Sequence, residues 1–134
     1  MTEPIGTSLR RKEDPRLLTG RGRYLDDIRV PGLLHAAIVR SPHARARVER
    51  IETGRAAAAP GVLAVLAAGD LPECAAAVPS LIPSPKLRPY VHPAIAGAEV
   101  RYAGEAVAVV VADDPYRAAD GAALVAVEYT PLPA

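Results

Sequence analysis

The chain has 134 residues, of which 50% are hydrophobic and 23% are charged, and this composition fits one compact globular domain with its own core. It contains no Trp or Phe and only five Tyr, so alanine fills many apolar positions and the core must be light. The chain has fourteen prolines, which argue against an all-helical bundle. Its net charge is +1, with +5 over residues 1–55 and −4 over residues 56–134.

Several classes of protein are disfavoured by these features. The basic residues are scattered along predicted strands, with no recognition helix for nucleic acid. No apolar run is long enough to span a membrane, and residues 1–18 lack the apolar core of a signal peptide. Cys74 is the only cysteine, which is compatible with a reducing compartment. We therefore expect a cytoplasmic protein that binds neither nucleic acid nor membrane.

The first predicted element is a short helical turn. Asp14 is a typical N-cap, Pro15 suits the first helical position, and Gly20 suits the exit. Residues 24–28, which include an aromatic residue, then predict a short strand.

The stretch TGRGRYLDDI, residues 19–28, has three interpretations. A phosphate cradle would need a strand-to-helix context that this stretch lacks. A metal site is disfavoured because Asp26 and Asp27, as neighbours in a strand, point to opposite faces. The favoured interpretation is structural, with glycines for the turn, Tyr24 in the core, and arginines at the surface or against a partner.

Two strands are predicted next. Residues 33–40 are apolar on both alternating faces, as in a strand covered on both sides. After a turn, alanine and valine alternate with charged residues from Ala44, which predicts a half-exposed strand. The alternation slips near Glu49 and Arg50, so we predict a bulge there that returns Ile51 to the core.

The middle of the chain predicts a helix, a strand and a long irregular excursion. Thr53 is placed to cap a short helix that ends before Pro60, and residues 62–67 read as a buried strand. Residues 72–99 contain six prolines and no sustained periodicity. Excursions of that length in a compact domain tend to be functional or mobile, and we expect this one to be the most mobile part of the chain.

The most regular pattern lies near the C-terminus. The valine-rich run at residues 106–112 predicts a central strand, and Asp114 with Pro115 predicts the start of a helix that reaches Val125. Gly121 inside this helix costs about 1 kcal/mol relative to alanine, which close packing of the helix on a sheet would offset. The chain then closes with a final strand.

Three stretches together resemble a known family. They are RRKEDPRLLTGRGRYLDDIRVPGLLHAAIVRSPHARARVERIET, APGVLAVLAAGDL and RYAGEAVAVVVADDPYRAADGAALVAVEYTPLP. In order and spacing they resemble the α/β hammerhead domain of the large, molybdenum-binding subunit of the aldehyde oxidase, xanthine dehydrogenase and aerobic carbon monoxide dehydrogenase family.

Three short motifs carry this resemblance. The family's YxDD segment corresponds to residues 24–27, its RSPHA segment to residues 40–44, and its YVGEPVA segment to residues 102–108. Two departures occur in the last segment, where Ala103 replaces valine and Ala106 replaces proline. The resemblance implies one α/β (α+β mixed) hammerhead domain over residues 1–134, a mixed sheet with helices packed on it and a proline-rich excursion at residues 72–99.

The resemblance also implies where the chemistry lies. In this family the molybdopterin ligands and the catalytic glutamate belong to domains that follow the hammerhead, so we assign no catalytic, cofactor-binding or metal-binding residue to this chain. The implied partners are a molybdenum-cofactor-binding domain or subunit, with a cofactor of the molybdopterin cytosine dinucleotide type, and, indirectly, iron–sulfur and FAD subunits.

Few residues are candidates for a metal site or a binding site within this chain. His35, His43 and His92 are not spaced as metal ligands. Gly104 and Glu105 could place a carboxylate beside the cofactor funnel of a partner. The favoured interpretation is that Gly104 allows close backbone approach and that Glu105 faces solvent or an arginine across an interface. The candidate partner interface is the following set: Arg40, His43, Arg45, Gly104 and Glu105.

Two functions from different classes follow. The first is a non-catalytic module of a molybdenum hydroxylase, an oxidoreductase, that packs on the molybdopterin-binding domains and helps to shape the substrate entrance. Charge reversal at Arg40 or Arg45 would then weaken the association. The second is a free-standing binding or scaffold protein, or a truncated fragment, without an enzymatic role. The substrate (carbon monoxide, aldehyde, purine or another heterocycle) stays open.

Overall fold

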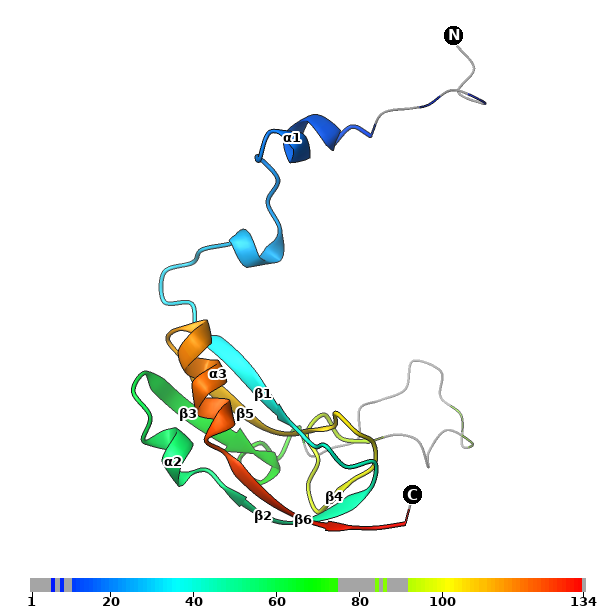
Figure 1. Cartoon of the computed structure of the whole chain (residues 1–134), viewed down its shortest axis with the longest axis vertical. Coiled ribbons are helices and arrows are strands. Elements are labelled where there is room, and N and C mark those ends of the chain that lie inside the picture. The colour runs from blue at the N-terminus through cyan, green and yellow to red at the C-terminus, as the bar shows by residue number, and fades with distance from the viewer. Residues whose placement is uncertain are drawn as a thin grey trace. The chain divides into compact units, whose positions relative to one another are not determined.

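The computed structural model describes residues 6, 8, 11–74, 84, 86 and 92–133. The chain divides into two compact units, Met1–Pro31 and Gly32–Ala134, and Figure 1 shows their elements. Nowhere in the described ranges is a helix long and apolar enough to cross a membrane.

The first unit contains the predicted helical turn, α1 (Asp14–Leu18), which has proline in its first turn. The N-cap is Glu13 rather than the predicted Asp14. The hydroxyl of Thr19 closes the far end by donating to the carbonyl oxygen of Pro15 at 2.6 Å. Gly20 follows with φ of +69°, in the left-handed region that favours glycine, so the predicted exit is confirmed.

The predicted strand at residues 24–28 is wrong. Leu25–Asp27 form a 3-10 turn, η1. The Asp27 carboxylate accepts a hydrogen bond from the Tyr24 backbone N–H at 2.9 Å, and this local bond closes a turn instead of leaving the backbone extended. Tyr24 is 66% exposed within the described structure, so its predicted place in the core is also wrong.

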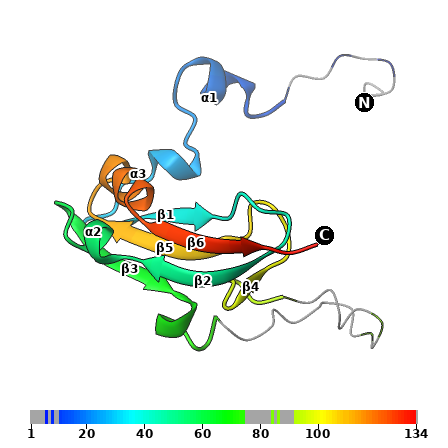
Figure 2. The ribbon, with the colours of Figure 1, turned by 60° about the horizontal axis from the view of Figure 1, so that its bottom comes forward.

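The described residues of the second unit form two three-stranded sheets, in which every strand pairing is antiparallel. We call them sheet A, ordered β1-β5-β3, and sheet B, ordered β4-β2-β6 (Figure 2). The strands are β1 (His35–Arg40), β2 (Ala46–Glu52), β3 (Val62–Ala67), β4 (Glu99–Val100), β5 (Ala106–Ala112) and β6 (Ala126–Pro131). The helices are α2 (Gly54–Ala57), α3 (Pro115–Ala123) and the 3-10 turn η2 (Ala68–Asp70). The α/β class is confirmed, with two antiparallel sheets in place of one mixed sheet.

The predicted central strand and its helix are confirmed, although the helix ends at Ala123 rather than at the predicted Val125. β5 lies between β1 and β3, and α3 packs on sheet A. The Asp114 carboxylate caps α3 by accepting from the backbone N–H groups of Tyr116 at 2.8 Å and Arg117 at 3.3 Å. A Cβ on Gly121 would lie 2.9 Å from side-chain atoms of both Val110 and Val62. Gly121 therefore permits α3 to approach sheet A closely. This is the contact that we expected to offset the unfavourable free energy of a glycine inside a helix.

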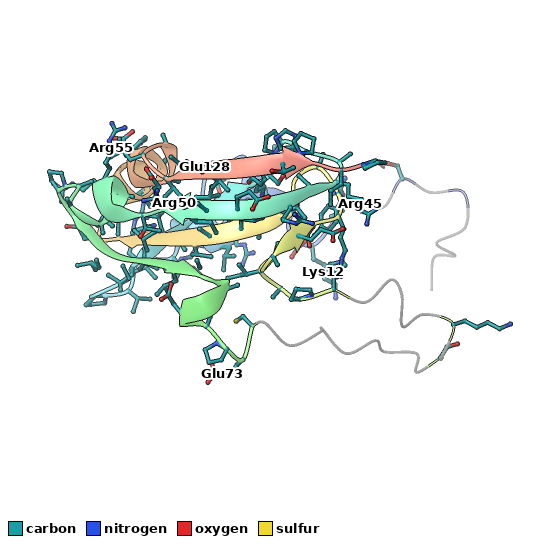
Figure 3. The ribbon with its side chains drawn as sticks, turned by 90° about the horizontal axis from the view of Figure 1, so that it is seen from below. Lys12, Arg45, Arg50, Arg55, Glu73 and Glu128 are labelled. Atoms are coloured by element: carbon teal, nitrogen blue, oxygen red, sulfur yellow. The ribbon has the colours of Figure 1, made fainter. Side chains whose placement is uncertain are left out.

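The predicted bulge is confirmed as well. In the pairing of β2 with β6, Val48 lies opposite Tyr129 whereas Arg50 lies opposite Glu128, so the register shifts at Glu49. Figure 3 labels Arg50 and Glu128 on these neighbouring strands. The extra residue restores the inward direction of Ile51, which is half-buried.

β1 and β3 are less covered than their sequences predict. Burial alternates along β1, with Ala36, Ile38 and Arg40 exposed and the residues between them half-buried. On β3, Leu63 is 60% exposed and the other residues are half-buried. The expectation that both strands are fully buried is wrong for the chain as described.

The Thr53 cap and the proline-rich excursion need smaller corrections. Thr53 precedes α2, but its side chain makes no capping hydrogen bond. Residues 75–83, 85 and 87–91 lie outside the described residues. The prediction that residues 72–99 are the most mobile part of the chain falls mostly on them. Ile95 and Ala96 are buried, and Ala96 N–H donates to the Ala106 carbonyl at 2.7 Å. This part of the excursion therefore supplies core contacts that its irregular sequence did not indicate.

The buried core joins the two sheets. Its central cluster contains Ala46 of sheet B, Val107 of sheet A, Val100 and Ala96. Half-buried side chains of both sheets pack against it: Val39, Val48, Val127 and Tyr129. The largest of the central four is valine, as the scarcity of aromatic residues predicted.

Candidate functional site

The predicted interface residues lie mainly where the turn after β1 meets the turn before β5. The Ser41 backbone N–H donates to the Glu105 carbonyl at 2.9 Å, and the Gly104 N–H donates to the Ser41 carbonyl at 2.7 Å. Both backbone groups of Ser41 are thus paired with the distant segment that contains Gly104 and Glu105. We call this region the β1–β5 corner and define it by residues 40–45 and 99–105.

Arg40 and Gly104 meet directly in this corner. The Arg40 guanidinium donates to the Gly104 carbonyl oxygen at 2.8 Å. Gly104 has φ of +92°, and no other atom lies within 4 Å of the position of a Cβ. The glycine is needed for its backbone conformation rather than for the close approach that we predicted.

Glu105 is buried, contrary to the expectation that it faces solvent. Its exposure is 2%, and its carboxylate accepts a hydrogen bond from the Arg101 backbone N–H at 2.5 Å. This bond spans the residues between β4 and β5 and fixes the turn that contains Gly104. Glu105 therefore acts within the fold, and its side chain is not available at the surface.

His43 and Arg45 lie on the sheet B side of the corner. The His43 ring packs at a tilt against Tyr129, with ring centroids 4.8 Å apart. The backbone N–H of His43 donates to the Ser41 hydroxyl at 3.1 Å, which holds the turn. Arg45 donates through Nε to Glu99 at 2.8 Å and through Nη1 to the Pro133 carbonyl at 3.1 Å.

The electrostatics of the corner are positive. The hydrogen bond from Arg45, together with the nearby charges of Arg45, Arg101 and Arg47, holds the pKa of Glu99 below its ordinary value. The nearest of these cations is Arg45, whose Nε lies 2.8 Å from the Glu99 carboxylate. The corner suits an acidic surface on a partner better than a basic one.

The polar groups of the corner are engaged in contacts within the fold. Ser41 is 2% exposed, and its hydroxyl accepts a hydrogen bond from the His43 backbone N–H, whereas the His43 ring packs on Tyr129. Across the described residues there is no group of three or more His, Cys, Asp or Glu side chains that could hold a metal. What the corner can do is hold the two sheets together and present cationic side chains.

The structure brings together Arg40, Gly104 and Glu105, and it places His43 and Arg45 beside them. Sequence reasoning missed Ser41, Glu99 and Arg101, which complete the corner. Ser41 and Arg101 lie in or next to the motifs RSPHA and RYAGEA, so their position beside the predicted residues was the available signal. Nothing in the periodicity indicates that β4 brings Glu99 to Arg45.

Comparison with known proteins gives the family. Residues 19–133 match the family model described as aldehyde oxidase and xanthine dehydrogenase, a/b hammerhead domain. The chain belongs to this family. Its two antiparallel sheets with α3 on sheet A are the architecture of the hammerhead domain in solved relatives.

Individual relatives from the same comparisons are similar to this chain over nearly all of its length. Over 129 residues, 96% of this chain, the hammerhead is 43% identical to the carbon monoxide dehydrogenase large chain of Afipia carboxidovorans. A structure of reconstituted CO dehydrogenase from Oligotropha carboxidovorans superposes with a TM-score of 0.83 at 43% identity over 96% of this chain. Quinoline 2-oxidoreductase from Pseudomonas putida 86 superposes with a TM-score of 0.82 at 41% identity over the whole chain.

The hammerhead corresponds to a small part of each relative. It spans 15% of the Afipia carboxidovorans large chain, 15% of the reconstituted CO dehydrogenase chain and 17% of the quinoline 2-oxidoreductase chain. Most of each relative therefore lies outside the region that this chain matches.

Proposed function

We propose that this hammerhead is a structural module of a molybdenum-dependent oxidoreductase and has no catalytic residue of its own. The observation that carries the proposal is that nearly the whole chain matches about 15% of a large chain. Consistently, the polar groups of the β1–β5 corner bind one another rather than forming an open site. The module would pack on the molybdopterin-binding domains and help to shape the substrate entrance.

The cofactors belong to the partners in this proposal. A relative of known structure is a Cu,Mo-CO dehydrogenase. Among the described residues there is no group of three or more His, Cys, Asp or Glu side chains that could hold a metal ion, and we assign no molybdenum ligand to this chain. We place a molybdopterin cytosine dinucleotide-type cofactor on the neighbouring domains, and iron–sulfur clusters and FAD on further subunits, which would carry electrons away.

The corner contributes to the interface through its surface residues. Arg40, His43, Arg45 and Gly104 are the proposed contacts, whereas Glu105 supports them from within the fold. Arg40 and Arg45 already bind Gly104 and Glu99, so charge reversal at either one would disturb the corner as well as a partner contact. A cytoplasmic location is part of the same proposal and is supported by the free thiol of Cys74.

The experiment is co-expression of this chain with the unmatched remainder of the Afipia carboxidovorans large chain. We expect a one-to-one complex in which molybdenum accompanies the remainder, and a higher unfolding temperature for the hammerhead than it has alone. Reversal of Arg45 to Glu should weaken the complex, and the unfolding temperature of the variant alone shows how much of the loss comes from the fold. Failure of the two wild-type polypeptides to associate would favour the free-standing scaffold.

A further inference from the structure

The two faces of sheet A are covered to different extents. On one face α3 approaches so closely that Gly121 lies against Val110 and Val62. Ala108, Val110 and Ala112 alternate along β5 and are fully buried. Successive side chains of a strand point to opposite faces, so Val109 and Val111 point away from α3.

The strand register identifies their neighbours on this second face. Ile38 of β1 and Leu66 of β3 both lie opposite Val109. Ala36 and Ala64 both lie opposite Val111. Directly opposed residues of antiparallel strands share a face. We call this face the open face of sheet A and define it by these six residues: Ala36, Ile38, Ala64, Leu66, Val109 and Val111.

The open face is apolar throughout and only partly covered. All six side chains are aliphatic. Ile38 is 46% exposed, Ala36 is exposed, and the remaining four are half-buried. A contiguous aliphatic surface in the middle of a sheet is typical of an interface rather than of a face that water covers.

Sheet B provides the internal contrast. Its strand β2 exposes charged side chains that pair along the strand, Arg47 with Glu49 at 4.0 Å and Arg50 with Glu52 at 3.1 Å. These side chains are 44–66% exposed and suit solvent. The same chain therefore makes one sheet surface that is compatible with water and one that is not.

We propose that the open face of sheet A is the surface on which the rest of the large-subunit polypeptide packs. This inference rests on the proposed function and specifies the surface that the function uses. The relatives carry about 85% of their length outside the matched region, so a large polypeptide accompanies the hammerhead in each of them.

A general argument and one observation favour this occupant over a second copy of the hammerhead. A polypeptide joined to the hammerhead, or held in one complex with it, competes at an effective concentration of about millimolar, which exceeds that of free copies. The open face also continues along β1 to Arg40, where the proposed contacts of the β1–β5 corner begin. The apolar face and the cationic corner thus form one continuous surface, with an apolar centre and a charged rim.

The test replaces an alanine or isoleucine of the open face by lysine. The variants are Ile38→Lys and Ala36→Lys, and the matched control is Ala126→Lys, an exposed alanine on β6 opposite Glu52. Each hammerhead is co-expressed with the unmatched remainder of the Afipia carboxidovorans large chain, and the affinity of the purified pair is measured. Unfolding temperatures of the isolated variants report any loss of fold.

We expect both open-face variants to bind about tenfold more weakly or worse, because a lysine charge would be buried against apolar groups. The Ala126→Lys control should bind as the wild type does, and the isolated variants should unfold near the wild-type temperature. Wild-type binding by both open-face variants would overturn the inference and leave the proposed function standing. Failure of the wild type to bind would overturn both. An isolated wild-type dimer that Ile38→Lys converts to a monomer would assign the face to a second copy and overturn the inference.

Discussion

Sheets A and B have the same number of strands and the same antiparallel pairing, yet their surfaces are completed differently. β2 of sheet B alternates buried or half-buried residues with exposed, ion-paired ones, so water completes that sheet. The central residues of sheet A are aliphatic on both faces, and α3 packs on one of these faces. The comparison shows that the composition of the second sheet face decides whether water or further apolar cover suits it.

The largest expected effect is on the covered face of sheet A. Gly121→Val would place side-chain carbons where a Cβ alone already lies 2.9 Å from Val110 and Val62. We expect a loss of about 3 kcal/mol in the free energy of unfolding, measured by urea denaturation, because overpacking forces the helix from the sheet. The control Ala119→Val lies at an exposed position of the same helix and should cost no more than about 0.5 kcal/mol. Equal losses in the two variants would contradict tight helix–sheet contact at Gly121.

The junction between the two sheets should be the next most sensitive region. Glu105→Ala removes the buried acceptor of the Arg101 N–H, between β4 of sheet B and β5 of sheet A. Leaving that donor without a partner should cost about 2 kcal/mol in unfolding free energy. Glu105→Gln keeps a side-chain oxygen and should retain most of the stability. If the glutamine variant is as unstable as the alanine variant, the hydrogen bond is not what Glu105 contributes.

A smaller loss of stability is expected at the N-terminal cap of α3, the helix that packs on the covered face. Asp114→Ala removes the acceptor for the N–H groups of Tyr116 and Arg117. We expect a loss of about 1 kcal/mol in thermal or urea unfolding. Asp114→Ser provides another capping oxygen and should recover most of it. A fully stable alanine variant would show that packing on sheet A alone fixes this helix end.

The smallest effect is expected at the exposed ion pair of Arg45 and Glu99. The pKa of Glu99 is lowered in the folded chain, chiefly by its hydrogen bond from Arg45, so the unfolded chain binds the proton more readily. The contribution of the pair is therefore complete above the ordinary carboxyl pKa of 4.5 and is lost as the pH falls through the lower folded value. The stability difference between wild type and Glu99→Gln should be small at pH 7 and should vanish in acid.

The side-chain titration of Glu99, followed by NMR, measures the same linkage directly. Arg45→Gln should raise the pKa of Glu99 towards its ordinary value, because it removes the donor and its charge. An unchanged titration in this variant would contradict the role of Arg45.

The sequence predicted the elements whose signals are local. The valine run of β5, the Asp114–Pro115 start of α3 and the slip at Glu49 each follow from the residues involved, and the structure confirms them. Gly121 was informative because its cost in a helix implied a contact, which the structure contains.

The sequence failed where a residue is determined by distant or competing contacts. Asp27 binds the Tyr24 backbone and forms a turn where the pattern predicted a strand. Ala96 joins the core through Ala106, and the carboxylate of Glu105 is buried against the backbone of Arg101. The open face was predicted as covered because an aliphatic strand does not indicate whether its cover belongs to the same unit.

The central claim is that the open face of sheet A, and not the charged surface of sheet B, is covered by the rest of the large subunit. The most direct measurement is the maleimide labelling rate of Ala36→Cys and Ala126→Cys, each with Cys74 replaced by serine. Rates are compared for the isolated chain and for its complex with the unmatched remainder of the Afipia carboxidovorans large chain. The account predicts that the complex strongly slows labelling at position 36 and leaves position 126 unchanged. Unchanged labelling at position 36 within a stable complex would contradict it.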